Sequence, residues 1–151
     1  TTPAASMRCV DVNVLVYAHR EDLPEHELHR TWLDLARRDP EPLGIPAVVA
    51  SGFLRVVTHP KVFELPSPME AALRFLEVLD ASPATVRLSS GPGHWAAFTR
   101  LCREIGARGN QVPDAFIAAH ALEVGATLVS ADRGFAGYPG LRWRHPADLD
   151  R

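Results

Sequence analysis

Apolar residues recur along the chain with two different spacings. Short apolar runs, such as MRCVDV near the start and TVRLSS in the middle, have the length of buried strands. Longer stretches repeat their apolar residues every three to four positions, as amphipathic helices do. The pattern predicts strands over residues 7–11, 42–46, 85–90, 127–130 and 141–146, and helices over residues 25–38, 47–59, 67–80, 93–106 and from Asp114 onward. This alternation indicates an α/β fold, which we expect to be a three-layer α/β/α sandwich around a mostly parallel sheet of about five strands.

Three of the predicted helices carry signals for their buried faces or their ends. In residues 25–38 the buried stripe is expected to consist of Leu28, Trp32, Leu35 and Ala36. In residues 67–80, Ser67 is expected to cap the N-terminus, with Pro68 at the first helical position. In residues 93–106 the buried stripe is expected to consist of Trp95, Phe98, Cys102 and Ile105, and Gly106 to end the helix.

The composition is that of one ordinary domain. With 151 residues, 46% of them hydrophobic, the chain can bury a sizeable core; we expect a single domain over residues 7–151 and a tail or cloning remnant over residues 1–6. No apolar stretch is long enough to cross a bilayer, so we expect a cytoplasmic protein with no membrane partner. Cys9 and Cys102 have no partners at metal-ligand spacing and are expected to be reduced core thiols. The net charge of −2 gives no overall attraction to nucleic acid.

Three aspartates stand at the ends of predicted elements. Asp11 ends the first strand, Asp132 lies just past the strand at 127–130, and Asp114 begins the helix that leads into that strand. In an open parallel sheet, ligands bind beyond the carboxyl ends of the strands, where loops and helix N-termini converge. We therefore expect the three carboxylates to meet at one rim of the sheet, although they are far apart in the sequence.

Carboxylates that gather in this way need a cation, because they repel one another and raise one another's pKa. An oxygen-rich set favours Mg²⁺ or Mn²⁺ over Zn²⁺, and such an ion could activate water against a phosphodiester. Taken singly, each aspartate could instead be a turn residue or a helix cap. The neighbouring Asn13, Asn110 and Ser130 are expected to orient the carboxylates or bind substrate, or with equal weight to be caps and turn residues. Arg55 and Arg133 are candidates for contacts to an RNA backbone.

Several segments together resemble the PIN domain, and in particular the toxins of VapBC-type toxin–antitoxin pairs: DVNVLVYA at Asp11, PDAFIAAHALEVGATLVSADRGF with Asp114 and Asp132, and LRW. The resemblance covers nearly the whole chain from Met7. It implies an Mg²⁺- or Mn²⁺-dependent endoribonuclease whose three aspartates hold the ion and whose products carry a 3′-hydroxyl and a 5′-phosphate. It also implies a small antitoxin whose C-terminal segment lies across the active groove, and a homodimer.

The chain departs from the family pattern at two positions that are often acidic. Gly52 stands where a glutamate often precedes the aromatic residue of the buried helix, although SGFLRVVTHPKVF resembles a subgroup in which that position is commonly not acidic. Gly134 stands where a further aspartate often follows Asp132. Fewer carboxylates hold a cation less tightly, so we expect at most one firmly held ion before RNA binds.

Two other functions are compatible with the same residues. A phosphatase could use Asp11 as its nucleophile at the end of the first strand, but haloacid-dehalogenase-like phosphatases need an aspartate two positions later, where this chain has Asn13. A degenerate nuclease fold could serve only as an RNA-binding or protein-interaction module, as Gly52 and Gly134 suggest. Such a module would bind RNA without divalent metal and would never cut it.

Overall fold

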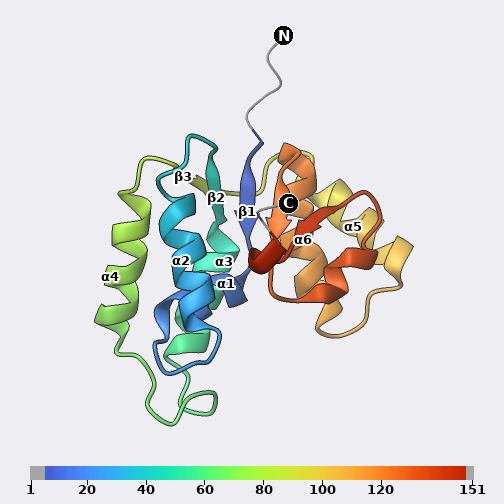
Figure 1. Ribbon diagram of the computed structural model, residues 1–151. Helices are drawn as coiled ribbons and strands as arrows, with labels where there is room; N and C mark the ends of the chain where they lie inside the picture. Colours follow the sequence, from blue (N-terminus) through green and yellow to red (C-terminus); the bar gives the residue numbers. More distant parts are fainter. Residues whose placement is uncertain (1–5, 149–151) are drawn as a thin grey trace.

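The computed structural model describes residues 6–148 of the chain. Within them the elements are β1 (Arg8–Val10), α1 (Val12–His19), α2 (His26–Ala36), β2 (Leu43–Pro46), α3 (Ala47–Val57), α4 (Met69–Asp80), β3 (Thr85–Leu88), α5 (His94–Ile105), α6 (Gln111–Val124), β4 (Thr127–Val129), the 3-10 turn η1 (Arg133–Gly137), β5 (Arg142–Arg144) and the 3-10 turn η2 (Pro146–Asp148) (Figure 1).

The strands form one parallel sheet in the order β3-β2-β1-β4-β5, which confirms the predicted fold class. The chain extends from β1 outward through β2 and β3, and then adds β4 and β5 on the other side. The switch point therefore lies between β1 and β4, and open sheets bind ligands in the crevice beyond the carboxyl ends at that point. Val10 is paired with Val129, so the residues that follow these two lie side by side at the rim.

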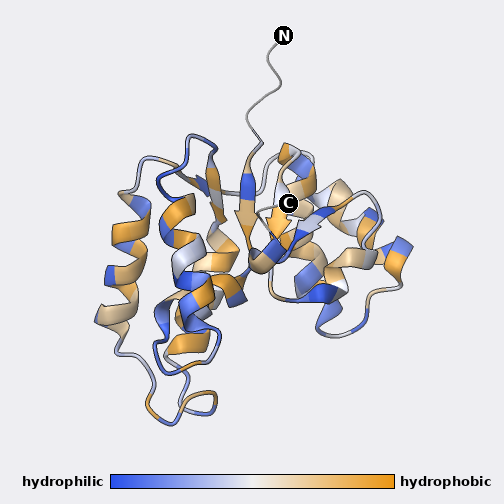
Figure 2. Ribbon diagram, in the orientation of Figure 1, coloured by the Kyte–Doolittle hydropathy of each residue, from blue (hydrophilic) through white to orange (hydrophobic). Residues whose placement is uncertain are grey.

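Helices cover both faces of the sheet. In Figure 1, α1 to α4 lie on one side of β1, and α5 and α6 lie on the other. Figure 2 shows apolar residues on the central strands and on the helix faces around them. Both cysteines are free, as predicted, with Cys9 buried and Cys102 partly buried. Among residues 6–148, no helix is long and apolar enough to span a membrane.

Helix α1 is an element that the sequence pattern did not reveal. Its sequence VNVLVYAH is rich in valine, which favours strands over helices. The helix begins because Asp11 takes an extended backbone (φ −86°, ψ 164°) and its carboxylate accepts a hydrogen bond from Val12 N at 2.7 Å. Most of the helix is buried, so packing rather than intrinsic propensity stabilises it.

The predicted buried stripes of two helices are partly wrong. In α2, Leu28 and Leu35 are 44% and 67% exposed, and His29 and Leu33 are buried in their place. His29 is polar, so the apolar periodicity did not place it in the core; its Nδ1 donates to the Glu25 carbonyl at 2.8 Å, while its buried Nε2 has no hydrogen-bond partner among the described residues. In α5, Trp95 is 66% exposed and the buried residues are His94 and Leu101, while Phe98, Cys102 and Ile105 are partly buried against the core.

The predicted cap of α4 is also wrong. Pro68 occupies the N-cap position, and no side chain caps the helix. The Ser67 hydroxyl instead contacts His19 Nε2 at 3.0 Å and accepts from Arg20 Nη1 at 3.2 Å. Ser67 therefore ties the start of α4 to the end of α1. At the end of α5, Gly106 has the left-handed backbone (φ 60°) that stops the helix, as predicted.

Candidate active site

The three aspartates singled out in the sequence line one pocket at the carboxyl rim of the sheet. Asp11 follows β1, Asp132 follows β4, and Asp114 lies in the first turn of α6. The pocket that they line has a volume of about 600 Å³. β1 and β4 are neighbours at the switch point, so the topology brings together carboxylates that are far apart in the sequence.

Asp11 is a buried carboxylate, only 6% exposed, that is held by hydrogen bonds. One oxygen accepts from Val12 N, and the other accepts from the Ser130 hydroxyl at 2.7 Å and from Asn13 Nδ2 at 3.3 Å. Burial raises the pKa of Asp11, the bonds from Ser130 and Val12 lower it, and the charge of Asp132 raises it. The bonds fix where the carboxylate points.

Ser130 connects the two strand ends. Its hydroxyl is completely buried, donates to Asp11, and accepts from Asn13 Nδ2 at 3.1 Å and from Asp132 N at 3.0 Å. The Asn13 side-chain oxygen accepts from Ala131 N at 3.1 Å. Asn13 and Ser130 therefore lie beside Asp11, where each donates to its carboxylate, and Ser130 also accepts from the backbone of Asp132.

Asp132 is exposed and caps the 3-10 turn that follows it. Its Oδ1 accepts from Gly134 N at 2.9 Å. A Cβ atom on Gly134 would lie 3.0 Å from that same oxygen. The glycine thus allows the backbone to approach the carboxylate closely, which an aspartate at position 134 would hinder.

Asp114 differs from the other two because its side chain caps no helix or turn. Its carboxylate accepts no hydrogen bond within residues 6–148, and it stands in the first turn of α6 rather than at the cap. Burial and the charges of Asp11 and Asp132 raise the pKa of Asp114 to about 6. Asp11 caps α1 and Asp132 caps η1, so these two aspartates also have the capping role that was the alternative explanation. Asp114 has no such role.

Of the remaining predicted residues, Asn110 and Arg55 line the pocket and Arg133 does not. Asn110 stands at the start of α6 without capping it by its side chain. Arg55 is exposed on α3. Arg133 extends instead toward the C-terminal side, 3.8 Å from the Asp148 carboxylate.

The structure adds aromatic and acidic residues that the sequence did not single out. The phenol of Tyr138 lies close enough to the three aspartates for their charges to act on it. Burial, and then these charges, raise the pKa of Tyr138 to about 12, so the phenol stays protonated at neutral pH. Tyr17 on α1, and Glu25 in the loop before α2, line the same pocket as the aspartates. No sequence motif marks these three residues, because only the tertiary fold brings them to the site.

The structure gives a steric reason for glycine at position 52. A Cβ atom there would lie 2.9 Å from Val12 Cγ2, in the first turn of α1. Gly52 therefore lets α3 approach α1 directly behind Asp11. An acidic side chain at this position would have to displace Val12.

The donor set fits a hard divalent cation, but the carboxylates do not form a ready-made cage. Asp11, Asp114 and Asp132 offer only oxygen atoms, which suits Mg²⁺ or Mn²⁺. Asp114 has both carboxylate oxygens free for a ligand, and the repulsion that raises its pKa would be relieved by a cation. Within residues 6–148, no three His, Cys, Asp or Glu side chains are already arranged to hold a metal ion. An ion shared by all three would bind partly through water.

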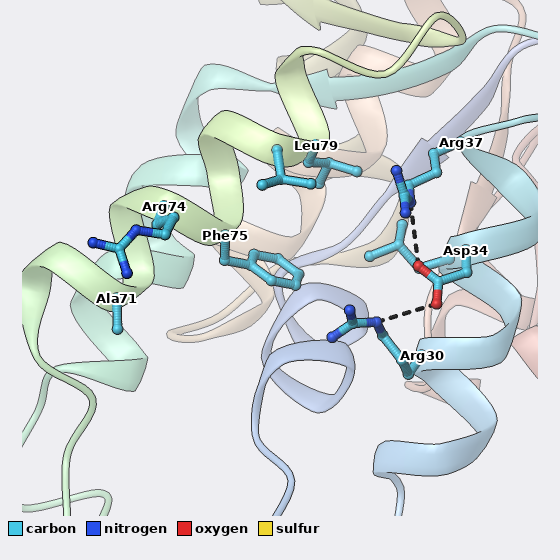
Figure 3. Close-up of a pocket in the computed structure, with 9 residues that line it drawn as sticks. Arg30, Asp34, Arg37, Ala71, Arg74, Phe75 and Leu79 are labelled. Atoms are coloured by element: carbon cyan, nitrogen blue, oxygen red, sulfur yellow. Dashed lines mark hydrogen bonds and ion pairs between the residues drawn. The ribbon is translucent and has the colours of Figure 1, made fainter.

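A second cavity, of about 270 Å³, lies between α2 and α4 and is a weaker candidate for chemistry (Figure 3). Phe75 and Leu79 of α4 contribute apolar surface, facing polar side chains of α2. Its carboxylate, Asp34, is paired with Arg30 and Arg37, each at 3.2 Å. The cavity thus has no free acid or nucleophile.

The sequence matches known proteins over most of its length. The model of the family described as the PIN domain matches residues 8–141. Ribonuclease VapC43 of Mycobacterium tuberculosis is 52% identical over 142 residues, which is 94% of this chain and 97% of the relative. Ribonuclease VapC25 of the same organism is 39% identical over 140 residues, 93% of this chain and 99% of the relative.

Solved structures share the fold at much lower sequence identity. VapBC2 from Rickettsia felis, bound to a DNA fragment from the promoter, superposes with a TM-score of 0.71 at 18% identity, over 92% of this chain and 98% of that chain. VapC20 from Mycobacterium tuberculosis, described as a sarcin-ricin loop cleaving toxin, gives a TM-score of 0.62 at 14% identity, over 89% of this chain and 98% of that chain. These likenesses establish the three-layer fold.

Proposed function

This chain belongs to the PIN domain family, and from that membership we propose that it is an endoribonuclease, the toxin of a toxin–antitoxin pair, that cleaves RNA with Mg²⁺ or Mn²⁺ through Asp11, Asp114 and Asp132. The relatives with 52% and 39% identity are named ribonucleases and match this chain nearly end to end. The proposal extends their activity to this protein.

The observation that carries the proposal is the position of Asp114. A carboxylate without any hydrogen-bond partner, half-buried beside two other carboxylates, is unfavourable unless a cation or a substrate uses it. Asp11 and Asp132 each have a capping bond that would explain them without function. Asp114 has none, so the pocket is best explained as an ion site.

The residues of the pocket have different roles in the proposed reaction. Asp11, Asp114 and Asp132 would hold the ion, which supplies a Lewis acid that lowers the pKa of water and offsets the charge of the phosphate. Ser130 and Asn13 keep the Asp11 carboxylate in one orientation through bonds of 2.7 and 3.3 Å. Arg55 and Asn110 line the pocket and can bind the RNA backbone.

The proposal is tested by incubating the purified protein with cellular RNA in Mg²⁺, in Mn²⁺ and in chelator, with Asp114→Asn alongside. We expect cleavage in either metal, no cleavage in chelator and none by the variant, with 5′-phosphate and 3′-hydroxyl ends on the products. RNA binding without any cleavage, whatever the metal, would favour the degenerate module that Gly52 and Gly134 suggest. Undiminished cleavage by the variant would exclude the assignment of Asp114.

The proposal includes protein partners. Several structures with the same fold are complexes of a VapC chain with its antitoxin, such as VapBC-1 from Haemophilus influenzae. We propose that this chain likewise binds a small antitoxin across the aspartate pocket, and that it forms a homodimer. Co-expression with the protein encoded by a neighbouring small reading frame, followed by sizing of the toxin alone and of the complex, tests both parts.

A further inference from the structure

The pocket that holds the three aspartates continues along α1 into a part with different chemistry. This far part is lined by Tyr17, Leu23, Glu25, Val56 and Phe63. Tyr17 follows Asp11 by six residues, which at 1.5 Å per residue places it about 9 Å farther along the helix axis. The pocket thus has an acidic end at the strand rim and a largely apolar end with one carboxylate.

That carboxylate belongs to Glu25, in the loop before α2. It makes no hydrogen bond or ion pair among residues 6–148, and it does not cap α2 although it stands at the N-cap position. Its backbone carbonyl accepts from His29 Nδ1 at 2.8 Å, which holds the loop in place. Glu25 is therefore a free acceptor on a fixed backbone.

The charge of Glu25 and the charges of the aspartates act on different groups. The charges that raise the pKa of Asp114 come from Asp11 and Asp132, whereas the charge of Glu25 acts on the phenol of Tyr17. A fourth carboxylate that shared the same ion would stand among the aspartates. Its place beside an aromatic ring points to a part of the substrate other than the scissile phosphate.

Two aromatic rings beside Glu25 are held in position. The ring of Tyr17 meets His29 edge to face, with centroids 4.8 Å apart. The guanidinium of Arg20 lies 4.0 Å from the centre of the Phe63 ring. Unpaired RNA bases are recognised by stacking on aromatic side chains and by hydrogen bonds to their Watson–Crick edges, and this part of the pocket offers both kinds of contact.

The chemistry of an ionised carboxylate selects among the four bases. It has only acceptor oxygens, and guanine is the base that presents two adjacent N–H donors, N1–H and N2–H, to which both oxygens can bind. Adenine and cytosine place an acceptor nitrogen beside their amino group, and uracil places its N–H between two carbonyls, so each would face one carboxylate oxygen with a lone pair.

We propose that the part of the pocket around Tyr17, Glu25 and Phe63 binds a guanine base of an unpaired RNA segment next to the cleavage site, with the Glu25 carboxylate accepting from N1–H and N2–H. The inference rests on the ribonuclease function proposed above and adds a base preference to it. It makes Glu25 a residue that determines specificity and takes no part in the reaction at the phosphate.

The test compares three proteins on a defined set of RNAs. Wild type, Glu25→Gln and the control Glu27→Gln are incubated with single-stranded RNA randomised around a central segment, and the products are sequenced. The guanine that wild type prefers is then replaced by inosine, which lacks only the N2 amino group. Glu27 is a matched control because it is exposed, lies two residues away and lines a separate groove with Leu28 and Trp32. Melting curves verify that all three proteins fold alike.

We expect wild type and Glu27→Gln to cleave the guanine RNA roughly 10- to 150-fold better than the inosine RNA, the range for loss of one hydrogen bond to a charged group, since inosine keeps N1–H. Glu25→Gln, which has one acceptor oxygen and no charge, should lose most of that difference and should cleave the inosine RNA no faster than wild type does, because inosine still offers N1–H to the Glu25 carboxylate. Equal preference for guanine in wild type and Glu25→Gln, or no guanine preference in wild type, would overturn the inference and leave the ribonuclease function standing.

Binding measured in chelator separates this inference from the function on which it rests. Fluorescence anisotropy with uncut guanine and inosine RNAs reports the contact even if no metal restores cleavage. A wild-type protein that cuts nothing yet binds guanine RNA more tightly than inosine RNA, with the difference lost in Glu25→Gln, would refute the ribonuclease and support the subsite. Equal affinity of wild type for both RNAs would refute the subsite.

Discussion

Replacing Asp114 by asparagine should stabilise the metal-free protein while it abolishes cleavage. The asparagine keeps the size of the side chain and removes a negative charge that stands beside Asp11 and Asp132 without a hydrogen-bond partner. Substitution of a residue that stabilises the fold lowers the free energy of unfolding. Substitution of a residue that binds a cation at the expense of stability should raise the free energy of unfolding of the metal-free protein.

The size of the effect follows from the pKa of Asp114. Its rise from 3.8 to about 6 corresponds to about 3 kcal/mol at neutral pH. The side chain is only partly buried, so solvent screens the repulsion and we expect about 1–2 kcal/mol. For a chain of this length, that raises the melting temperature by roughly 2–8 °C.

The dependence on pH has a definite sign. Between about pH 4 and pH 6, the folded protein keeps a proton on Asp114 that the unfolded chain has lost, so the free energy of unfolding of wild type falls as pH rises through this window. Asp114→Asn lacks this titration. The stability difference between variant and wild type should therefore be largest at pH 7 and vanish near pH 4.

Chemical denaturation in chelator, at several pH values, measures this difference. Glu70→Gln is the matched control, since Glu70 is likewise acidic in the first turn of a helix but is exposed and far from the three aspartates. It should change stability by no more than about 0.5 kcal/mol at any pH. A destabilised Asp114→Asn at pH 7, or a gain that does not depend on pH, would refute the account of the site as a cluster of unneutralised carboxylates.

Three further variants probe the surroundings of the site. Ser130→Ala removes the 2.7 Å bond to Asp11, so it should lower stability by about 1–3 kcal/mol and weaken Mn²⁺ binding roughly 10- to 100-fold. Unchanged Mn²⁺ affinity in a titration would contradict the role of Ser130 in orienting Asp11. Gly52→Glu should lower stability by about 1–3 kcal/mol because of the clash with Val12, and tighter Mn²⁺ binding would show that position 52 can serve the ion. Tyr138→Phe should leave the pH dependence of cleavage unchanged up to pH 10, because the wild-type phenol has a pKa of about 12. A fall of the wild-type cleavage rate at alkaline pH that is absent from the variant would contradict this.

The sequence was informative where a local pattern determines the structure. The apolar runs predicted the strands of the sheet, and the parallel order implied that residues following β1 and β4 meet, which placed Asp11 and Asp132 in one pocket. The same reasoning placed Asn13 beside Asp11 and Ser130 beside Asp132, and the structure adds that the Ser130 hydroxyl also donates to Asp11.

The failures come from interactions between distant segments. Helix α1 was missed because burial of Val14, Leu15 and Val16 outweighs the strand preference of valine. Glu25 and Tyr138 were missed because no spacing in the sequence records which loops lie near the aspartates: Glu25 lines their pocket, and Tyr138 lies close enough for their charges to raise its pKa.

The register of β1 against β4 has a consequence for when the protein can act. Val10 pairs with Val129, and a slip of β4 by one residue would turn Ser130 to the opposite face and leave the Asp11 oxygen to which it donates with the longer bond from Asn13 alone. The segment that supplies Ser130 and Asp132 leaves the ribosome long after the one that supplies Asp11. A partly synthesised or mispaired chain therefore lacks the assembled aspartate pocket, which forms only after β4 has paired with β1.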